Sequence, residues 1–248
     1  MTPMTMAAVL GVMVLCGVSP CSGAPCDEAT VSALAPDGWQ VGGKWVGQLD
    51  GQGADELAVA ISECKATAGT DAADWWVHYG GVSRLLILDS ANADAGVLAS
   101  FEFNGCAPPA DVAPSMQAPF FTRDLDGDGL LELSLRTHSS GGGSPHWVHV
   151  NTIKWYNDAY RRVGTYGVAE GGGLFYLDVL KTNPGQEVIL LNYVKDGAGN
   201  HTGPARYRVQ VYGWANGWYS LIRDFTTSST YRFPEPAFKN LKRYLWKK

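Results

Sequence analysis

The chain has 248 residues, of which 46% are hydrophobic and 17% are charged, a balance that supports a buried core and excludes a disordered chain. The formal net charge is −5, so no concentrated basic surface is expected for nucleic acid. Thirty glycines, nine tryptophans and eleven tyrosines favour short strands joined by tight turns over a helical bundle. We therefore expect one large all-β domain.

The N-terminal segment predicts export. Met6–Val18 is an uninterrupted apolar run, followed by small residues at 22–24. A membrane-spanning helix needs about 20 apolar residues, so this run is too short to cross a bilayer. We expect residues 1–24 to be a signal peptide and the protein to be secreted, periplasmic or on the cell surface. The cleavage site stays open, as does a lipid anchor on one of the early cysteines, Cys16, Cys21 or Cys26.

Three cysteines, Cys26, Cys64 and Cys106, remain if the first two leave with the signal peptide. An oxidising compartment favours one disulfide and one remaining thiol. Cys64 and Cys106 both lie just beyond predicted strands, so we expect these two to pair. Three buried free thiols are the alternative.

Short apolar runs of strand length recur from Trp39 onward, with turn residues between them. In Leu131–Thr137, for example, leucines alternate with polar residues, as in a strand with two unlike faces. The clearest runs are Glu56–Ser62, Arg84–Asp89, Gly96–Phe103, Leu131–Thr137, Trp147–Trp155, Gly173–Asp178, Glu187–Val194, Ala205–Trp214 and Gly217–Asp224.

An internal repeat organises these strands. Each copy opens with a turn-rich loop and continues into an apolar strand that begins at Glu56, Glu132 or Glu187. Two copies then form a hairpin around an aromatic turn, at 154–160 and 213–219. With one strand ahead of each loop, every copy has four strands, which is how propeller blades are built. We predict a propeller-like array of about three four-stranded repeats.

The loop of the second copy has the spacing of a calcium site. Asp124, Asp126 and Asp128 place carboxylates at alternate positions, where they would repel one another without a cation. Calcium takes six to eight oxygen ligands in a tolerant geometry, whereas magnesium keeps its waters. We expect Ca²⁺ to be bound by these three aspartates, by the carbonyl of Leu130 and by the carboxylate of Glu132.

Two alternatives compete with this site. An EF-hand would need a bidentate glutamate at the twelfth position, where Leu135 stands within a predicted strand, so this reading is excluded. A solvated acidic turn without an ion is the other alternative. Metal binding by the other two copies is left open, because the first keeps only Asp50 and Glu56 as carboxylates at ligand positions and the third has Lys181 in place of Asp126.

The segment Asp124–Leu133, with Phe120–Arg123 before it and an apolar strand after it, resembles the FG-GAP or VCBS type of repeat. Such repeats form the β-propellers of integrin α-subunits and of many secreted bacterial proteins. The resemblance covers most of 39–230 as a pattern, and it implies a calcium site and a role in adhesion or ligand recognition. Closed propellers have four to eight blades, so three repeats allow a divergent fourth blade, an open three-unit arrangement or a homo-oligomer that completes the propeller.

We accordingly expect a repeat domain over 25–233 and a basic C-terminal helix or tail over 234–248. In that tail Phe238, Leu241 and Leu245 have helical spacing. Its apolar face is expected to pack on the domain itself, and contact with an acidic surface or a partner is the alternative.

The function expected from these features is a calcium-stabilised binding module that recognises an extracellular or cell-envelope protein or glycan. The alternative is a secreted hydrolase or lyase on the same scaffold. No catalytic motif such as Gly-x-Ser-x-Gly or His-Glu-x-x-His is present, which favours binding. His146 and His149 are three apart on a predicted strand, so they face opposite sides and are not expected to share a metal ion. Trp75 and Trp76 either pack between sheets or form an exposed contact patch.

Overall fold

The computed structural model describes residues 28–66, 79–90, 96–107, 119–140, 146–169, 171–178, 185–194 and 203–245. These residues form three four-stranded antiparallel sheets and two short helices. The predictions of an all-β domain, of four strands per repeat and of a short C-terminal helix are therefore confirmed. The predicted signal peptide, Cys26, the pair Trp75 and Trp76, and Lys181 lie outside the described residues.

Each sheet is one copy of the repeat, and its strands are neighbours in chain order. The first sheet contains β1 (Gln40–Gly47), β2 (Glu56–Ala66), β3 (Tyr79–Asp89) and β4 (Val97–Asn104). The second contains β5 (Phe120–Arg123), β6 (Glu132–Ser140), β7 (His146–Trp155) and β8 (Tyr160–Ala169). The third contains β9 (Gly173–Leu177), β10 (Glu187–Val194), β11 (Arg206–Ala215) and β12 (Trp218–Thr226).

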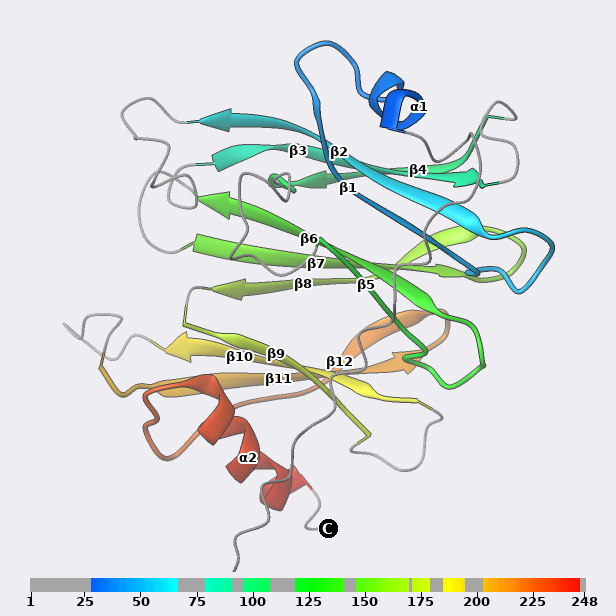
Figure 1. The fold of residues 1–248 in the computed structure, drawn as a ribbon. Helices are drawn as coiled ribbons and strands as arrows, with labels where there is room; N and C mark the ends of the chain where they lie inside the picture. The colour runs from blue at the N-terminus through cyan, green and yellow to red at the C-terminus, as the bar shows by residue number, and fades with distance from the viewer. Residues whose placement is uncertain are drawn as a thin grey trace, which may run out of the picture.

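The three sheets are stacked face to face, and the second lies between the other two (Figure 1). Helix α1 (Glu28–Ala33) covers the outer face of the first sheet, where Val31 packs with Leu57 and Val59. Helix α2 (Pro234–Leu245) covers the outer face of the third sheet through Ala237 and Leu241. Among the described residues, no helix has the length and apolar character needed to span a membrane.

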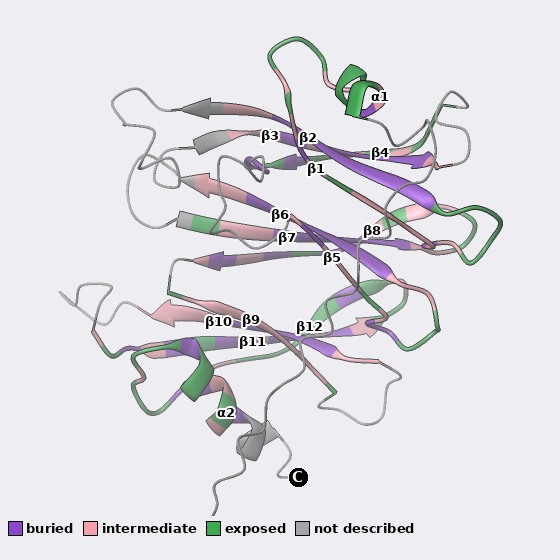
Figure 2. Ribbon diagram, viewed as in Figure 1, coloured by how far each residue is buried: buried purple, intermediate pink, exposed green. Residues whose placement is uncertain are grey.

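Apolar residues form a buried cluster at each interface between sheets, and Figure 2 shows buried segments in the strands of all three sheets. Leu85 and Ile87 of β3 pack with Leu133 and Leu135 of β6 between the first and second sheets. A separate cluster, which includes Val150, Val163, Val188 and Leu190, fills the space between the second and third sheets. Burial on both faces explains why β2 and β10 are almost continuously apolar instead of alternating.

The predicted disulfide between Cys64 and Cys106 is present. Cys106 follows β4, as expected, but Cys64 lies inside β2 and not beyond it. Because β3 separates β2 from β4 in the sheet, the disulfide ties together two segments that are not hydrogen-bonded neighbours.

Two-residue turns close the predicted aromatic hairpins. Between β7 and β8, Asn157 and Asp158 have φ values of 51° and 56°, and between β11 and β12, Asn216 and Gly217 have values of 55° and 81°. Positive φ at both central residues is the geometry that matches the twist of a β-hairpin. Asparagine, aspartate and glycine adopt it at low cost.

Candidate metal centre in the second repeat

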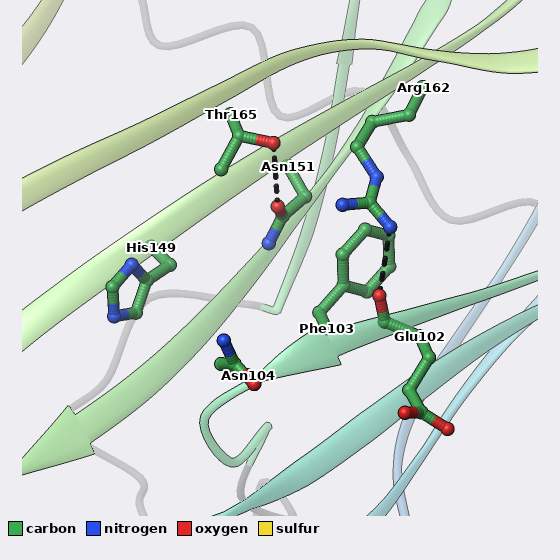
Figure 3. Close-up of a pocket in the computed structure, with 7 residues that line it drawn as sticks. All are labelled: Glu102, Phe103, Asn104, His149, Asn151, Arg162 and Thr165. Carbon is green, nitrogen blue, oxygen red and sulfur yellow. Dashed lines mark hydrogen bonds between the residues drawn. The ribbon is translucent and has the colours of Figure 1, made fainter.

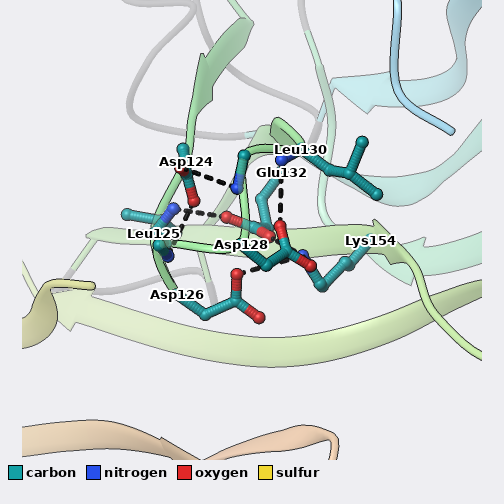
Figure 4. A network of polar contacts seen from close by, with 9 residues as sticks. Asp124, Leu125, Asp126, Asp128, Leu130, Glu132 and Lys154 are labelled. Carbon is teal, nitrogen blue, oxygen red and sulfur yellow. Dashed lines mark hydrogen bonds and ion pairs between the residues drawn. The ribbon is translucent and has the colours of Figure 1, made fainter. Parts of the chain in front are cut away.

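The loop between β5 and β6 is folded around its own carboxylates (Figure 4). Asp124 accepts hydrogen bonds from the amides of Gly127, at 2.7 Å, and Gly129, at 3.1 Å. Asp128 accepts a third from the amide of Leu130 at 2.9 Å. Gly127 and Gly129 have φ values of 78° and 91°, which glycine reaches without steric cost. The backbone amides thus hold these carboxylates in place.

Three of the five predicted metal ligands come together in this loop. Asp124, Asp126 and Asp128 each offer one carboxylate oxygen, and these oxygens all lie within 4.8 Å of one another. The three residues therefore could bind a metal ion. Asp126 is buried, whereas Asp128 is exposed, so the cluster extends from the protein interior to the solvent.

The carboxylate of Glu132, the first residue of β6, is engaged on both sides. One oxygen accepts a hydrogen bond from the amide of Leu125 at 2.5 Å, and the other accepts one from the ammonium of Lys154 at 2.6 Å. Glu132 is only 1% exposed. A metal ion at Glu132 would therefore share an oxygen with one of these partners or displace it. The ligand roles of Glu132 and of the Leu130 carbonyl stay predictions.

Lys154 is a member of this cluster that the sequence analysis missed. It lies on β7 and is 1% exposed. Its Nζ atom is 3.1 Å from Asp126, 2.8 Å from Asp128 and 2.6 Å from Glu132. The register explains this position, because Leu133 of β6 pairs with Ile153 of β7, so the adjacent residues, Glu132 and Lys154, lie across from each other. Cross-strand register is the signal that could have identified Lys154.

The charges of this network are unequal, since the Lys154 ammonium pairs with three carboxylates and the loop holds a fourth, that of Asp124. Burial raises the pKa of Glu132 to about 7 despite its bond to Lys154, and burial likewise raises the pKa of Asp126. For Asp128 burial acts in the same direction, but the hydrogen bonds from Lys154 and from the Leu130 amide, together with the charge of Lys154, outweigh it and lower the pKa. The carboxylates in turn raise the pKa of Lys154 against the effect of its burial. Lys154 is thus held as a cation, and the loop keeps an excess of negative charge.

The donor set fits a hard divalent cation in part. Carboxylate oxygens are the ligands that calcium prefers, and Asp124, Asp126 and Asp128 would hold such an ion. Lys154 supplies a fixed positive charge beside Asp126, Asp128 and Glu132. An ion bound by the three aspartates would therefore share two of its ligands with Lys154.

In the first repeat, as in the second, the glutamate that begins the second strand accepts a hydrogen bond from the preceding loop. Lys154 of the second repeat has no counterpart at the position opposite the glutamate in the first. Glu56 is 3% exposed and accepts a hydrogen bond from the amide of Leu49 at 2.7 Å, as Glu132 does from Leu125. The residue opposite Glu56 in the register of β2 and β3 is Asp89, the last residue of β3. The glutamate at the start of the second strand therefore closes the preceding loop in both repeats. The buried ammonium of Lys154, opposite this glutamate, is a feature of the second repeat.

The same glutamates lie close to the tyrosines of the following sheet. The charge of Glu56 adds to the effect of burial in raising the pKa of Tyr160, at the start of β8. The charge of Glu132 does the same for Tyr219, the corresponding residue of β12. The recurring glutamates and the recurring aromatic turns therefore meet at the contacts between successive sheets.

No protein-family model matches the chain, and no curated protein matches its sequence. Two solved structures resemble it. One is the crystal structure of CarG, with a TM-score of 0.39 and 8% identity, which covers 54% of this chain and 98% of CarG. The other is the crystal structure of the rhamnogalacturonan lyase YesW, with a TM-score of 0.36 and 16% identity, which covers 77% of this chain and 35% of that one. Likenesses this distant assign neither a family nor a function.

Proposed function

We propose that the protein is a secreted or cell-envelope binding module, stabilised by calcium, that recognises an extracellular or envelope protein or glycan. The observation that carries this proposal is the second-repeat loop, where three aspartate carboxylates converge and a single lysine leaves much of their charge unbalanced. The Cys64–Cys106 disulfide adds support for export, because such bonds persist in oxidising compartments.

The proposed calcium ligands are Asp124, Asp126 and Asp128, with Leu130 and Glu132 as the remaining predicted members of the set. The role of the ion would be structural. It would offset the repulsion between these carboxylates and fix the turn between β5 and β6, while Lys154 balances the buried end of the cluster. The ion would thereby hold the loop that closes one end of the central sheet.

The scaffold is proposed to be an open, propeller-like array of three blades. Its support is the pair of helices, since α1 covers the outer face of the first sheet and α2 that of the third. A fourth blade or a second copy would need one of these apolar faces. The helices therefore favour the open three-unit arrangement over a homo-oligomer that completes a ring.

The catalytic alternative, a secreted hydrolase or lyase, has weaker support. A pocket of about 450 Å³ between the second and third sheets is lined in part by Arg136, His138 and Glu235. Burial, together with the charge of Arg136, lowers the pKa of His138 to about 4. A general base works best when its pKa is near the operating pH, so this histidine is poorly matched to proton transfer at neutral pH.

A combined binding and turnover assay separates the two functions. The mature protein would be incubated with defined envelope and extracellular polysaccharides and with purified surface proteins, in calcium and in EDTA. The proposal predicts saturable binding to one such ligand, with that ligand recovered intact. New reducing ends, unsaturated sugars or peptide fragments would contradict it and favour the enzyme.

A further inference from the structure

A polar pocket of about 170 Å³ lies between β4 of the first sheet and β7 and β8 of the second (Figure 3). The face of β7 that packs against the first sheet changes character here, since Ile153 belongs to the apolar core whereas Asn151 and His149 line the pocket. The first and second sheets are thus in apolar contact around Ile153, and a polar pocket separates them around Asn151 and His149. This pocket lies apart from the acidic loop of the second repeat.

Asn151 forms the floor of the pocket and is only 3% exposed. Its carbonyl oxygen accepts a hydrogen bond from the hydroxyl of Thr165, its cross-strand partner, at 3.2 Å. The amide nitrogen has no acceptor among the described residues, and it points into the pocket in Figure 3. This nitrogen is not among the fully buried unpaired polar atoms of the described residues, so water in the pocket can reach it and it is available as a donor to a bound molecule.

Arg162 forms one wall and is held in a fixed position. One terminal nitrogen donates to the backbone carbonyl of Glu102 at 2.8 Å, and the guanidinium lies 4.6 Å from the centre of the Phe103 ring. The other terminal nitrogen points toward Asn151 (Figure 3). The carboxylate of Glu102 is turned away from the pocket and pairs with Arg84 at 3.3 Å. The pocket therefore keeps the positive charge of Arg162.

The remaining lining is neutral and polar. Burial lowers the pKa of His149, so its ring is uncharged at neutral pH, and its Nε2 atom is 2.8 Å from the hydroxyl of Ser139. Asn104 extends from β4 toward the same space as Asn151 (Figure 3). Beside His149, Trp147 is 37% exposed, with its ring centre 6.5 Å from that of the histidine. An exposed indole offers a flat apolar surface at the rim.

We propose that this pocket binds the carboxylate of a uronic acid residue in an acidic glycan. The amide of Asn151 and the guanidinium of Arg162 would donate to the carboxylate, because two N–H donors and a positive charge match its oxygens. Asn104 and Thr165 would bind ring hydroxyls, and Trp147 would pack against the adjoining sugar. A water molecule occupies about 30 Å³, so the pocket volume of about 170 Å³ corresponds to about five or six waters, room for a sugar carboxylate and the ring atoms beside it but not for a folded peptide. The inference rests on the proposed function and names its ligand class.

An NMR titration of the ¹⁵N-labelled mature protein tests the site directly. D-glucuronate and D-glucose are matched probes, because they differ in having a carboxylate or a hydroxymethyl group at C6. The pocket is expected to bind glucuronate at least about tenfold more tightly than glucose, with shifts in the side-chain amide of Asn151. Equal binding of both sugars, or shifts confined to other parts of the protein, would overturn the proposal.

Arg162→Gln and Arg161→Gln are matched variants of neighbouring residues on β8. Arg161 is exposed and donates to the carbonyl of Tyr156, outside the pocket. Arg162→Gln is expected to weaken glucuronate binding about tenfold or more, and Arg161→Gln to change it by less than about twofold. Equal effects of the two variants would overturn the proposal. The NMR spectra verify that each variant is folded.

N-acetylglycine separates a sugar carboxylate from the C-terminus of a peptide. Binding of N-acetylglycine as tight as that of glucuronate, and lost in Arg162→Gln, would overturn the glycan assignment in favour of a peptide ligand. If the protein binds an envelope ligand with the same affinity in wild type and in Arg162→Gln, the binding function stands and this pocket is not its site. Failure of the whole proposed function would instead appear as turnover of that ligand.

Discussion

Lys154 and the carboxylates around it show how a single residue decides the character of the second-repeat loop. Its ammonium is almost completely buried and forms three ion pairs. Breaking a buried ion pair by removing one partner is costly, since the remaining charges lose their compensation. Lys154 is therefore expected to be essential to the loop when no metal ion is bound.

Lys154→Met is predicted to lower the free energy of unfolding by about 3–5 kcal/mol in EDTA. The methionine keeps much of the side-chain volume but leaves Asp126, Asp128 and Glu132 without their shared cation. Denaturant unfolding measures the change, and added calcium should restore part of it by replacing the lost positive charge. Lys239→Met is the control, because Lys239 is exposed on α2 and should cost less than about 0.5 kcal/mol. Similar losses for the two variants would contradict this account.

Glu56 gives a prediction for the pH dependence of stability. Burial raises its pKa from 4.5 to about 6 in the folded protein. Its stabilising contribution is therefore fully present below pH 4.5 and is lost as the pH rises through about 6. Relative to Glu56→Gln, the wild type should lose on the order of 1–2 kcal/mol between pH 4.5 and pH 7. Parallel stability curves for the two proteins, measured by unfolding at each pH, would contradict the assignment.

At the level of elements, the Cys64–Cys106 disulfide holds the first sheet together across β3. It closes a loop with a sequence separation of 42 residues. A cross-link of this span restricts the unfolded chain and typically stabilises by about 2–4 kcal/mol. The segment between the two cysteines includes the whole of β3 and β4.

The double variant Cys64→Ser, Cys106→Ser is accordingly predicted to lose about 2–4 kcal/mol of stability. Thermal unfolding with and without a reducing agent measures the effect. The wild type should lose a similar amount on reduction, whereas the double variant should not respond to the reductant. Unchanged stability of the wild type on reduction would show that this bond does not constrain the sheet.

The sequence indicated most of the strands because their apolar runs are long. The clearest runs did not include β1 (Gln40–Gly47), β5 (Phe120–Arg123) or β8 (Tyr160–Ala169), since β5 has only four residues and β8 mixes arginine, glycine and threonine with its apolar residues. The three aspartates could be predicted from spacing alone, because they lie within one loop. Lys154 and the Asn151–Arg162 pocket could not, because they depend on which strands pair and on how two sheets pack.

At the level of the whole molecule, helices α1 and α2 cover the apolar outer faces of the first and third sheets. Leu241 is 4% exposed and packs with Ile189 and Val209 on the outer face of the third sheet. Phe238 adds a stacked contact with Phe175, with ring centres 4.2 Å apart. Without α2 this face would expose a continuous apolar surface, and such surfaces promote association.

Leu241→Ser is predicted to lower the free energy of unfolding by about 2–5 kcal/mol, because it removes buried apolar volume and buries a hydroxyl. Lys239→Ser, at an exposed position of the same helix, is the control. The wild type should be monomeric by light scattering, and Leu241→Ser should associate as its concentration rises. A stable wild-type dimer that forms through the third sheet would contradict the open stack.

Calcium-dependent melting of the wild type and of Asp124→Asn tests the central claim most directly, because the ion pairs of Lys154 within the described residues are with Asp126, Asp128 and Glu132 and not with Asp124. At about one hundred times the dissociation constant, calcium should raise the melting temperature of the wild type by about 5–10 °C relative to EDTA. Asp124→Asn should lose most of this increase. The same melting temperature for the wild type in calcium and in EDTA would contradict the claim and leave Lys154 as the cation that holds the loop.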